Sequence, residues 1–194
     1  MKVKIFFIVI TIFLLPFNLM AKETSKQWLE TKGRYLIETF GEKDIAKKHQ
    51  KLDELLTQDV DLAYIARFVI GKYYRDMNET QKQRYMASFK NYALYTYKQF
   101  PLDFGDSINF KVDNVVENKN LINAQVLISI SPESVFDVEF VLRTVDDNYK
   151  IVDIKVGESS FLIAYRSRFY EMIADADGEI DWFIEDLEAL AKKK

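Results

Sequence analysis

Residues 122–130 read INAQVLISI, residues 136–142 read FDVEFVL and residues 152–156 read VDIKV. In each stretch an apolar residue occupies every second position and more polar residues lie between, with a break at Val141, which is the two-residue period of a β-strand with one buried face. INFKVD at residues 108–113 alternates in the same way. Turn-like connections separate the four stretches at residues 117–120, 131–134 and 146–148. Because such short connections join antiparallel neighbours, the region predicts a four-stranded, twisted antiparallel meander with one apolar face.

Both flanks of this strand region show a helical period instead. Asn78 and Gln81 form a capping-box pattern, which predicts that a helix begins there. The expected helices span residues 24–40, 44–56, 61–74, 78–100, 161–173 and 180–190. Helices from both chain ends against one sheet define an α+β domain. Their packing on one face makes a half-open cone, which is either filled by side chains or encloses an apolar cavity.

The composition excludes several classes of protein. The chain has 194 residues, 48% hydrophobic, with 6 Gly and 3 Pro, which is typical of one globular domain. It has no cysteine, so a disulfide scaffold, a thiol nucleophile and a cysteine zinc site are excluded. The formal net charge of −3 shows no basic excess, so we expect no nucleic-acid partner.

The first 21 residues have the pattern of a signal peptide. Lys2 and Lys4 precede an apolar run at residues 5–15, Pro16 follows it, and Ala21 suits the last position before cleavage. The run is too short for a permanent membrane span. We therefore expect residues 1–21 to be removed and residues 22–194 to form a single exported domain, with an uncleaved N-terminal anchor as the alternative. In a Gram-negative bacterium that domain would lie in the periplasm.

The candidate catalytic and metal sites are weak. His49 is the only histidine and lies among lysines of a predicted helix, which favours a solvated face. The acidic segment 175–181 resembles a calcium loop, but the register places Ile173 and Ile184 at ligand positions, so we interpret it as an interhelical turn. Asp153 could act as a general base in a cone-shaped isomerase, but its strand alternation predicts an outward side chain. We expect no catalytic residue and no metal.

Separate blocks of sequence carry a family resemblance. They read DLAYIARFVIGKYYR from residue 61, NYKIVDIKV from residue 148 and SSFLIAYRSRF from residue 159. Their order and spacing resemble the MlaC family, also called the toluene-tolerance auxiliary family, over almost the whole mature chain. The family usually reads EGVS after the last strand, whereas this chain has Gly157-Glu158-Ser159-Ser160.

The resemblance implies a periplasmic phospholipid carrier without a cofactor, and not an enzyme. Such a carrier takes one phospholipid with its tails between the sheet and the helices. Its partners would be an outer-membrane lipoprotein complex and an inner-membrane MCE-domain protein of an ABC transporter, and its role would be to maintain outer-membrane lipid asymmetry. The alternatives are a cone-fold small-molecule isomerase and a non-lipid periplasmic adaptor with a filled core.

The resemblance also suggests which residues contact the lipid. The predicted cavity positions are Phe68, Val69, Phe89, Tyr92, Val126, Ile128, Val138, Phe140, Val152, Ile154, Phe161 and Tyr165. Arg67, Arg75 and Arg166 are candidates for the head group, because a guanidinium suits phosphate, although each could instead pair with an acid and hold helices together.

Overall fold

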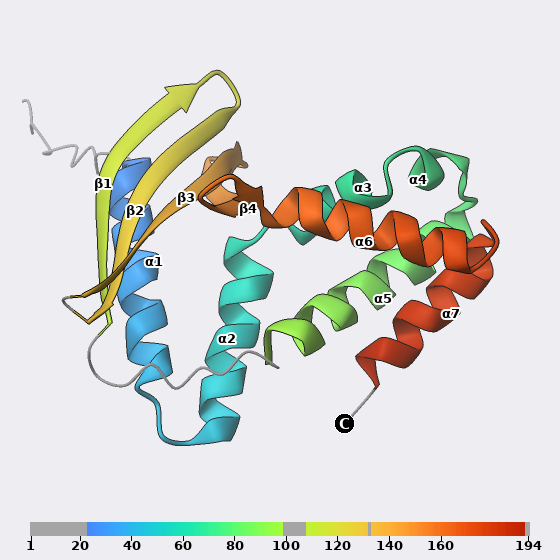
Figure 1. Cartoon of the computed structure of the whole chain (residues 1–194), viewed down its shortest axis with the longest axis horizontal. Coiled ribbons are helices and arrows are strands. Elements are labelled where there is room, and N and C mark those ends of the chain that lie inside the picture. Colours follow the sequence, from blue (N-terminus) through green and yellow to red (C-terminus); the bar gives the residue numbers. More distant parts are fainter. Residues whose placement is uncertain (1–22, 99–107, 132, 193–194) are drawn as a thin grey trace, which may run out of the picture.

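A strand-rich half and a helical half make up the molecule (Figure 1). This computed structural model describes residues 23–98, 108–131 and 133–192, so the predicted signal peptide lies outside the described residues. The helices before the sheet are α1 (Ser25–Phe40), α2 (Ile45–Asp59), α3 (Leu62–Ile70), α4 (Lys72–Asp76) and α5 (Glu79–Lys98). The strands are β1 (Asn109–Asn118), β2 (Leu121–Ser131), β3 (Ser134–Val145), β4 (Asn148–Val156) and β5 (Ser159–Ser160). Helices α6 (Phe161–Asp175) and α7 (Ile180–Ala191) follow.

The sheet is antiparallel throughout, with the strands in chain order from β1 to β5. This confirms the α+β class and the predicted meander, but the prediction of four strands was wrong. The fifth strand is Ser159–Ser160, which pairs with Val156 and Lys155 of β4. Two residues are too few to show a period, so sequence alternation could not reveal this strand.

Local sequence signals explain where the helices begin and break. Asn78 and Gln81 exchange the expected hydrogen bonds, since the Asn78 side chain accepts from Gln81 N at 2.9 Å and Asn78 N donates to Gln81 Oε1 at 3.1 Å. The single helix predicted for residues 61–74 is divided at Gly71, where φ is +47°. Glycine adopts this left-handed conformation without the steric cost that a side chain would add.

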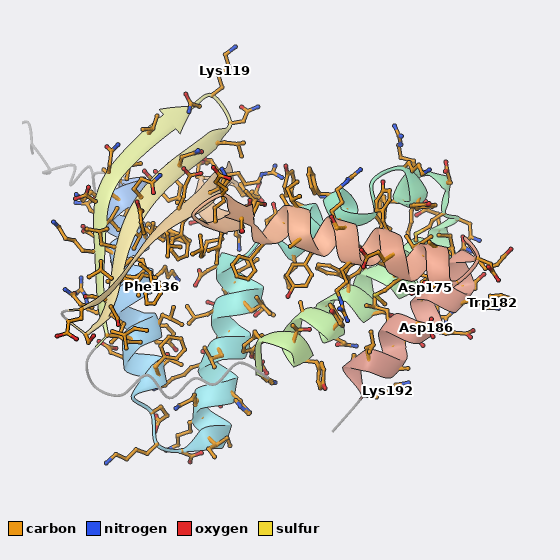
Figure 2. All side chains as sticks on the ribbon, in the orientation of Figure 1. Lys119, Phe136, Asp175, Trp182, Asp186 and Lys192 are labelled. Atoms are coloured by element: carbon orange, nitrogen blue, oxygen red, sulfur yellow. The ribbon has the colours of Figure 1, made fainter. Side chains whose placement is uncertain are left out.

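The interior is divided into two hydrophobic cores. In the strand-rich half, α1 packs on the sheet through Leu29 against residues such as Val126 and Leu142. In the helical half, α3, α5, α6 and α7 pack around Tyr85 and Phe169. Figure 1 shows α2 standing between the halves, where it contacts α1, α5 and β4. In Figure 2, Lys119 at the sheet end and Trp182 at the helical end mark opposite extremities.

A bulge in β4 changes which of its residues face the interior. Leu142 pairs with Ile151 and Val141 pairs with Asp153, so β4 carries one extra residue at this point. Strict alternation predicted an outward Asp153, but the structure buries it at 9% exposure.

No helix within residues 23–98, 108–131 and 133–192 is long and apolar enough to cross a membrane.

Candidate functional site

An apolar hollow lies between α1, α2 and the sheet. We call it the sheet-side pocket, and its volume is about 380 Å³, within the range of small-molecule sites. It is lined by Leu29, Lys32, Gly33, Leu36, Phe40, Leu52, Leu55, Leu56, Asp59, Val60, Tyr97, Phe110, Phe140, Ile151 and Ile154. The charged members Lys32 and Asp59 form an ion pair at 2.8 Å. The pocket suits a hydrocarbon ligand, because its charges are satisfied within the protein.

A second hollow adjoins the first between α2, α3, α5, β4 and α6. This helix-side pocket has a volume of about 180 Å³. Residues that line both pockets are Leu56, Val60, Tyr97, Ile151 and Ile154. The bulge in β4 allows this sharing, because Ile151 and Ile154 are three residues apart and would point to opposite faces of a regular strand. The two hollows therefore lie side by side between the two cores and share one wall.

A third hollow lies outward of the helix-side pocket and shares Tyr92, Phe161 and Tyr165 with it. This outer pocket has a volume of about 430 Å³. Arg168 of α6 lines it, and Arg168 Nε donates to the Tyr92 hydroxyl at 3.1 Å. The side chain of Arg168 is exposed. A guanidinium at this position can bind an anion while the apolar part of the ligand lies deeper.

Tyr97 links α5 to α2 at the wall shared by the two inner pockets. Its hydroxyl donates to Asp53 Oδ1, and Lys98 Nζ lies 3.0 Å from the same carboxylate. Burial, together with the Asp53 carboxylate, raises the pKa of Tyr97 well above its ordinary value. Tyr97 and Asp53 are 44 positions apart in the chain, so their pairing could not be seen in the sequence.

Asp153 ties β4 to the first turn of α6. Its carboxylate accepts from Leu162 N at 2.9 Å, from Ser160 Oγ at 2.6 Å and from Ile154 N at 2.8 Å. Ser160 is in turn the N-cap of α6 and accepts from Ile163 N at 3.0 Å. The carboxylate thus holds the segment that carries Phe161 and Tyr165, and its bonding suits a structural tie better than a general base.

The structure brings half of the predicted cavity residues to the helix-side pocket. These are Phe89, Tyr92, Val152, Ile154, Phe161 and Tyr165. Phe140 and Ile154 line the sheet-side pocket. Val126 and Val138 belong to the sheet core with Ile128 packed against it, and Val69 lies in the helical core. Phe68 stacks on Tyr64 with ring centroids 6.2 Å apart. A lipid contact at each of these positions stays a prediction.

The predicted head-group arginines line none of the three pockets described above. Arg166 donates to the Phe68 carbonyl at 2.5 Å and to the Tyr170 hydroxyl at 2.9 Å, so it holds α6 to α3. Arg67 and Arg75 are exposed on α3 and α4. Arg168, which was not among the predicted head-group residues, lines the outer pocket. Its one signal in the sequence is its place three residues after Tyr165 on the same helix.

Metal-binding potential is low in the described part of the chain. Over residues 23–98, 108–131 and 133–192, no three histidine or carboxylate side chains are grouped so that they could hold a metal ion. The acidic segment near Gly178 is the turn between α6 and α7, as expected, with φ of 80° at that glycine.

Comparisons with known proteins agree with this architecture. A family model described as MlaC protein matches residues 37–189. A solved structure from Ralstonia solanacearum, described as a phospholipid-binding protein in complex with a phospholipid, superposes with a TM-score of 0.72 at 14% identity. The superposition covers 87% of this chain and 97% of that one, which establishes the shared fold. No curated protein sequence matches the chain significantly.

Proposed function

Because the chain belongs to the MlaC family, we propose that it is a phospholipid-binding carrier of the periplasm and not an enzyme. It takes single lipids between an outer-membrane lipoprotein complex and an inner-membrane ABC transporter with an MCE-domain subunit, and so maintains the lipid asymmetry of the outer membrane. The observation that carries this proposal is the pair of adjoining apolar hollows, the sheet-side and helix-side pockets, between the two cores.

The chemistry of the pockets supports a diacyl lipid. The two inner pockets share the lining residues Leu56, Tyr97 and Ile154, so one acyl chain of a glycerolipid can enter each pocket. The phosphate then lies toward the outer pocket, where Arg168 provides a cation. The neighbour of known structure, which shares this fold, is described in complex with a phospholipid.

The energetics suit a carrier better than a permanent binder. Burial of a methylene from water contributes about 0.8 kcal/mol, so two chains of about 15 methylenes give roughly 20 kcal/mol of gross stabilisation against water. A lipid in a bilayer is already shielded from water, however, and transfer from membrane to pocket is close to neutral. The carrier can therefore both load and unload, and the direction of transport must come from its partners.

Filling the shared wall of the two pockets tests the proposal. Ile154→Trp places an indole where both pockets meet, and Leu56→Trp does the same from α2. Each delipidated variant is incubated with liposomes, separated from them, and its bound phospholipid is quantified by mass spectrometry. Ile45→Trp is the matched control, because Ile45 is 68% exposed at the start of α2.

The expected result is lipid uptake by the wild-type protein and the control, with little or none by the two pocket variants. Circular dichroism and thermal unfolding establish that each variant is folded. Equal lipid uptake by all folded variants would contradict the pocket as the lipid site. Absence of uptake by the wild-type protein would contradict the carrier function itself.

A further inference from the structure

One wall of the sheet-side pocket is a close contact between a helix backbone and an aromatic ring. Gly33 lies inside α1, is buried, and faces Phe110 of β1. A Cβ atom added to Gly33 would lie 2.3 Å from Phe110 Cδ1 and 2.5 Å from Cε1. Such separations are far shorter than a carbon–carbon contact, so no larger residue fits while the ring keeps this position.

Glycine is an unfavourable residue within a helix, because it restricts the unfolded chain less than alanine does. The backbone of α1 here is ordinary helix, so no unusual φ requires glycine at position 33. The close approach of Phe110 is the feature of the structure that does require it. The glycine therefore provides space for the ring.

The ring that occupies this space also packs against a second ring. Phe110 and Phe140 pack edge to face with centroids 5.8 Å apart. Gly33, Phe110 and Phe140 all line the sheet-side pocket. Because Phe110 itself lines the sheet-side pocket, a ring displaced from the helix can move into that pocket.

From this geometry we propose that Gly33 and Phe110 set the depth of the sheet-side pocket, and thereby the acyl-chain length of the lipid that the protein accepts. The inference rests on the proposed function and adds a specificity to it. The ring seated against Gly33 leaves room for the end of a long acyl chain. A side chain at position 33 moves the ring into that room and shortens the pocket.

The expected size of the effect follows from the methylenes that no longer fit. When a lipid moves from a bilayer into the pocket, each methylene that does not fit in the pocket is exposed to water. This weakens binding of that lipid by about fourfold per methylene. Exclusion of one or two methylenes changes the preference between short and long chains by about fourfold to fifteenfold.

The test is a competition between two phosphatidylethanolamines that differ in chain length. Delipidated protein is incubated with vesicles holding equal amounts of the lipid with fourteen-carbon monounsaturated chains and the lipid with eighteen-carbon monounsaturated chains. The ratio of the two bound species is then read by native mass spectrometry. Gly33→Ala should shift the ratio toward the short lipid by at least about fourfold, and Phe110→Leu should shift it toward the long lipid.

Gly41→Ala is the matched control, at the C-cap of the same helix. Gly41 has φ of −72° and ψ of −9°, and a Cβ atom there would approach no atom closer than 3.6 Å. This variant should keep the wild-type ratio. The double variant Gly33→Ala/Phe110→Leu should return toward the wild-type ratio, because the smaller residue at 110 makes room for the methyl group.

If Gly33→Ala does not fold, Phe110→Leu carries the test by itself, since it leaves α1 unchanged. A wild-type ratio in the folded variants would overturn the inference and leave the carrier function standing. Failure of the wild-type protein to bind either lipid would instead contradict the proposed function.

Discussion

Removing the Asp153 carboxylate should destabilise the fold more than any exposed acid does. In Asp153→Ala the backbone N–H of Leu162, the hydroxyl of Ser160 and the backbone N–H of Ile154 all lose their acceptor. A hydrogen bond to a charged group is worth about 1.5–3 kcal/mol, but these three share one carboxylate and are not additive. We therefore expect a loss of about 3–5 kcal/mol in the free energy of unfolding.

Urea denaturation followed by far-UV circular dichroism measures this loss. For a domain of this size it corresponds to a fall in melting temperature of roughly 8–16 °C. Asp137→Ala is the control, because Asp137 is exposed on β3 of the same sheet and should change stability by less than about 0.5 kcal/mol.

Asp153→Asn separates charge from shape. The amide keeps one acceptor oxygen and loses the other, so the variant should be intermediate between Asp153→Ala and the wild-type protein. If Asp153→Ala unfolds within about 0.5 kcal/mol of the wild-type protein, the carboxylate is not the tie between β4 and α6, and the reasoning from its three hydrogen bonds is refuted.

Three further predictions concern single side chains. Arg168→Ala should weaken phospholipid uptake from vesicles by about tenfold or more, because a charge-assisted hydrogen bond to phosphate is lost. Uptake of uncharged diacylglycerol should not change. An equal loss for both lipids would contradict a head-group role for Arg168. Burial and Asp53 raise the pKa of Tyr97 in the folded protein. The contribution of Tyr97 to the free energy of unfolding is therefore fully present below pH 10 and is lost as the pH rises above 10. Denaturation measured at a series of pH values should show a smaller loss of stability above pH 10 for Tyr97→Phe than for the wild-type protein. Arg84 lowers the pKa of Glu188 in the folded protein. Glu188→Gln should therefore lower the free energy of unfolding by no more than about 0.5 kcal/mol at pH 7, and this difference from the wild-type protein should shrink as the pH falls below 4.5. A loss that does not depend on pH would contradict the ion pair.

Regular periodicity predicted those parts of the fold that repeat over many residues. The strands around Val126 and Val138 and the capping box at Asn78 each repeat or match a known pattern, and the structure confirms them. β5 is too short to repeat, and the helix break at Gly71 depends on one residue with an unusual φ. Such single-residue events have little signal in the sequence of one chain.

The candidate site was harder to predict than the fold, because the bulge in β4 determines which residues of this strand line the pockets. Alternation expected Val152 and Ile154 inside and Asp153 outside, but the extra residue brings Ile151 to the pockets and buries Asp153. Arg166 also shows the limit of inference by residue type, because a guanidinium suits phosphate and a helix carbonyl equally. The structure shows that Arg166 donates to the Phe68 carbonyl oxygen and that Arg168, not Arg166, lines the outer pocket.

Native mass spectrometry of the purified protein tests most directly whether the hollow between the two cores holds a lipid. We expect a species whose mass exceeds that of the polypeptide by one phospholipid, which is released on denaturation and is reduced in the folded Ile154→Trp variant. A wild-type protein that carries no added mass, even after incubation with liposomes, would contradict the claim that the hollow between the two cores holds a lipid.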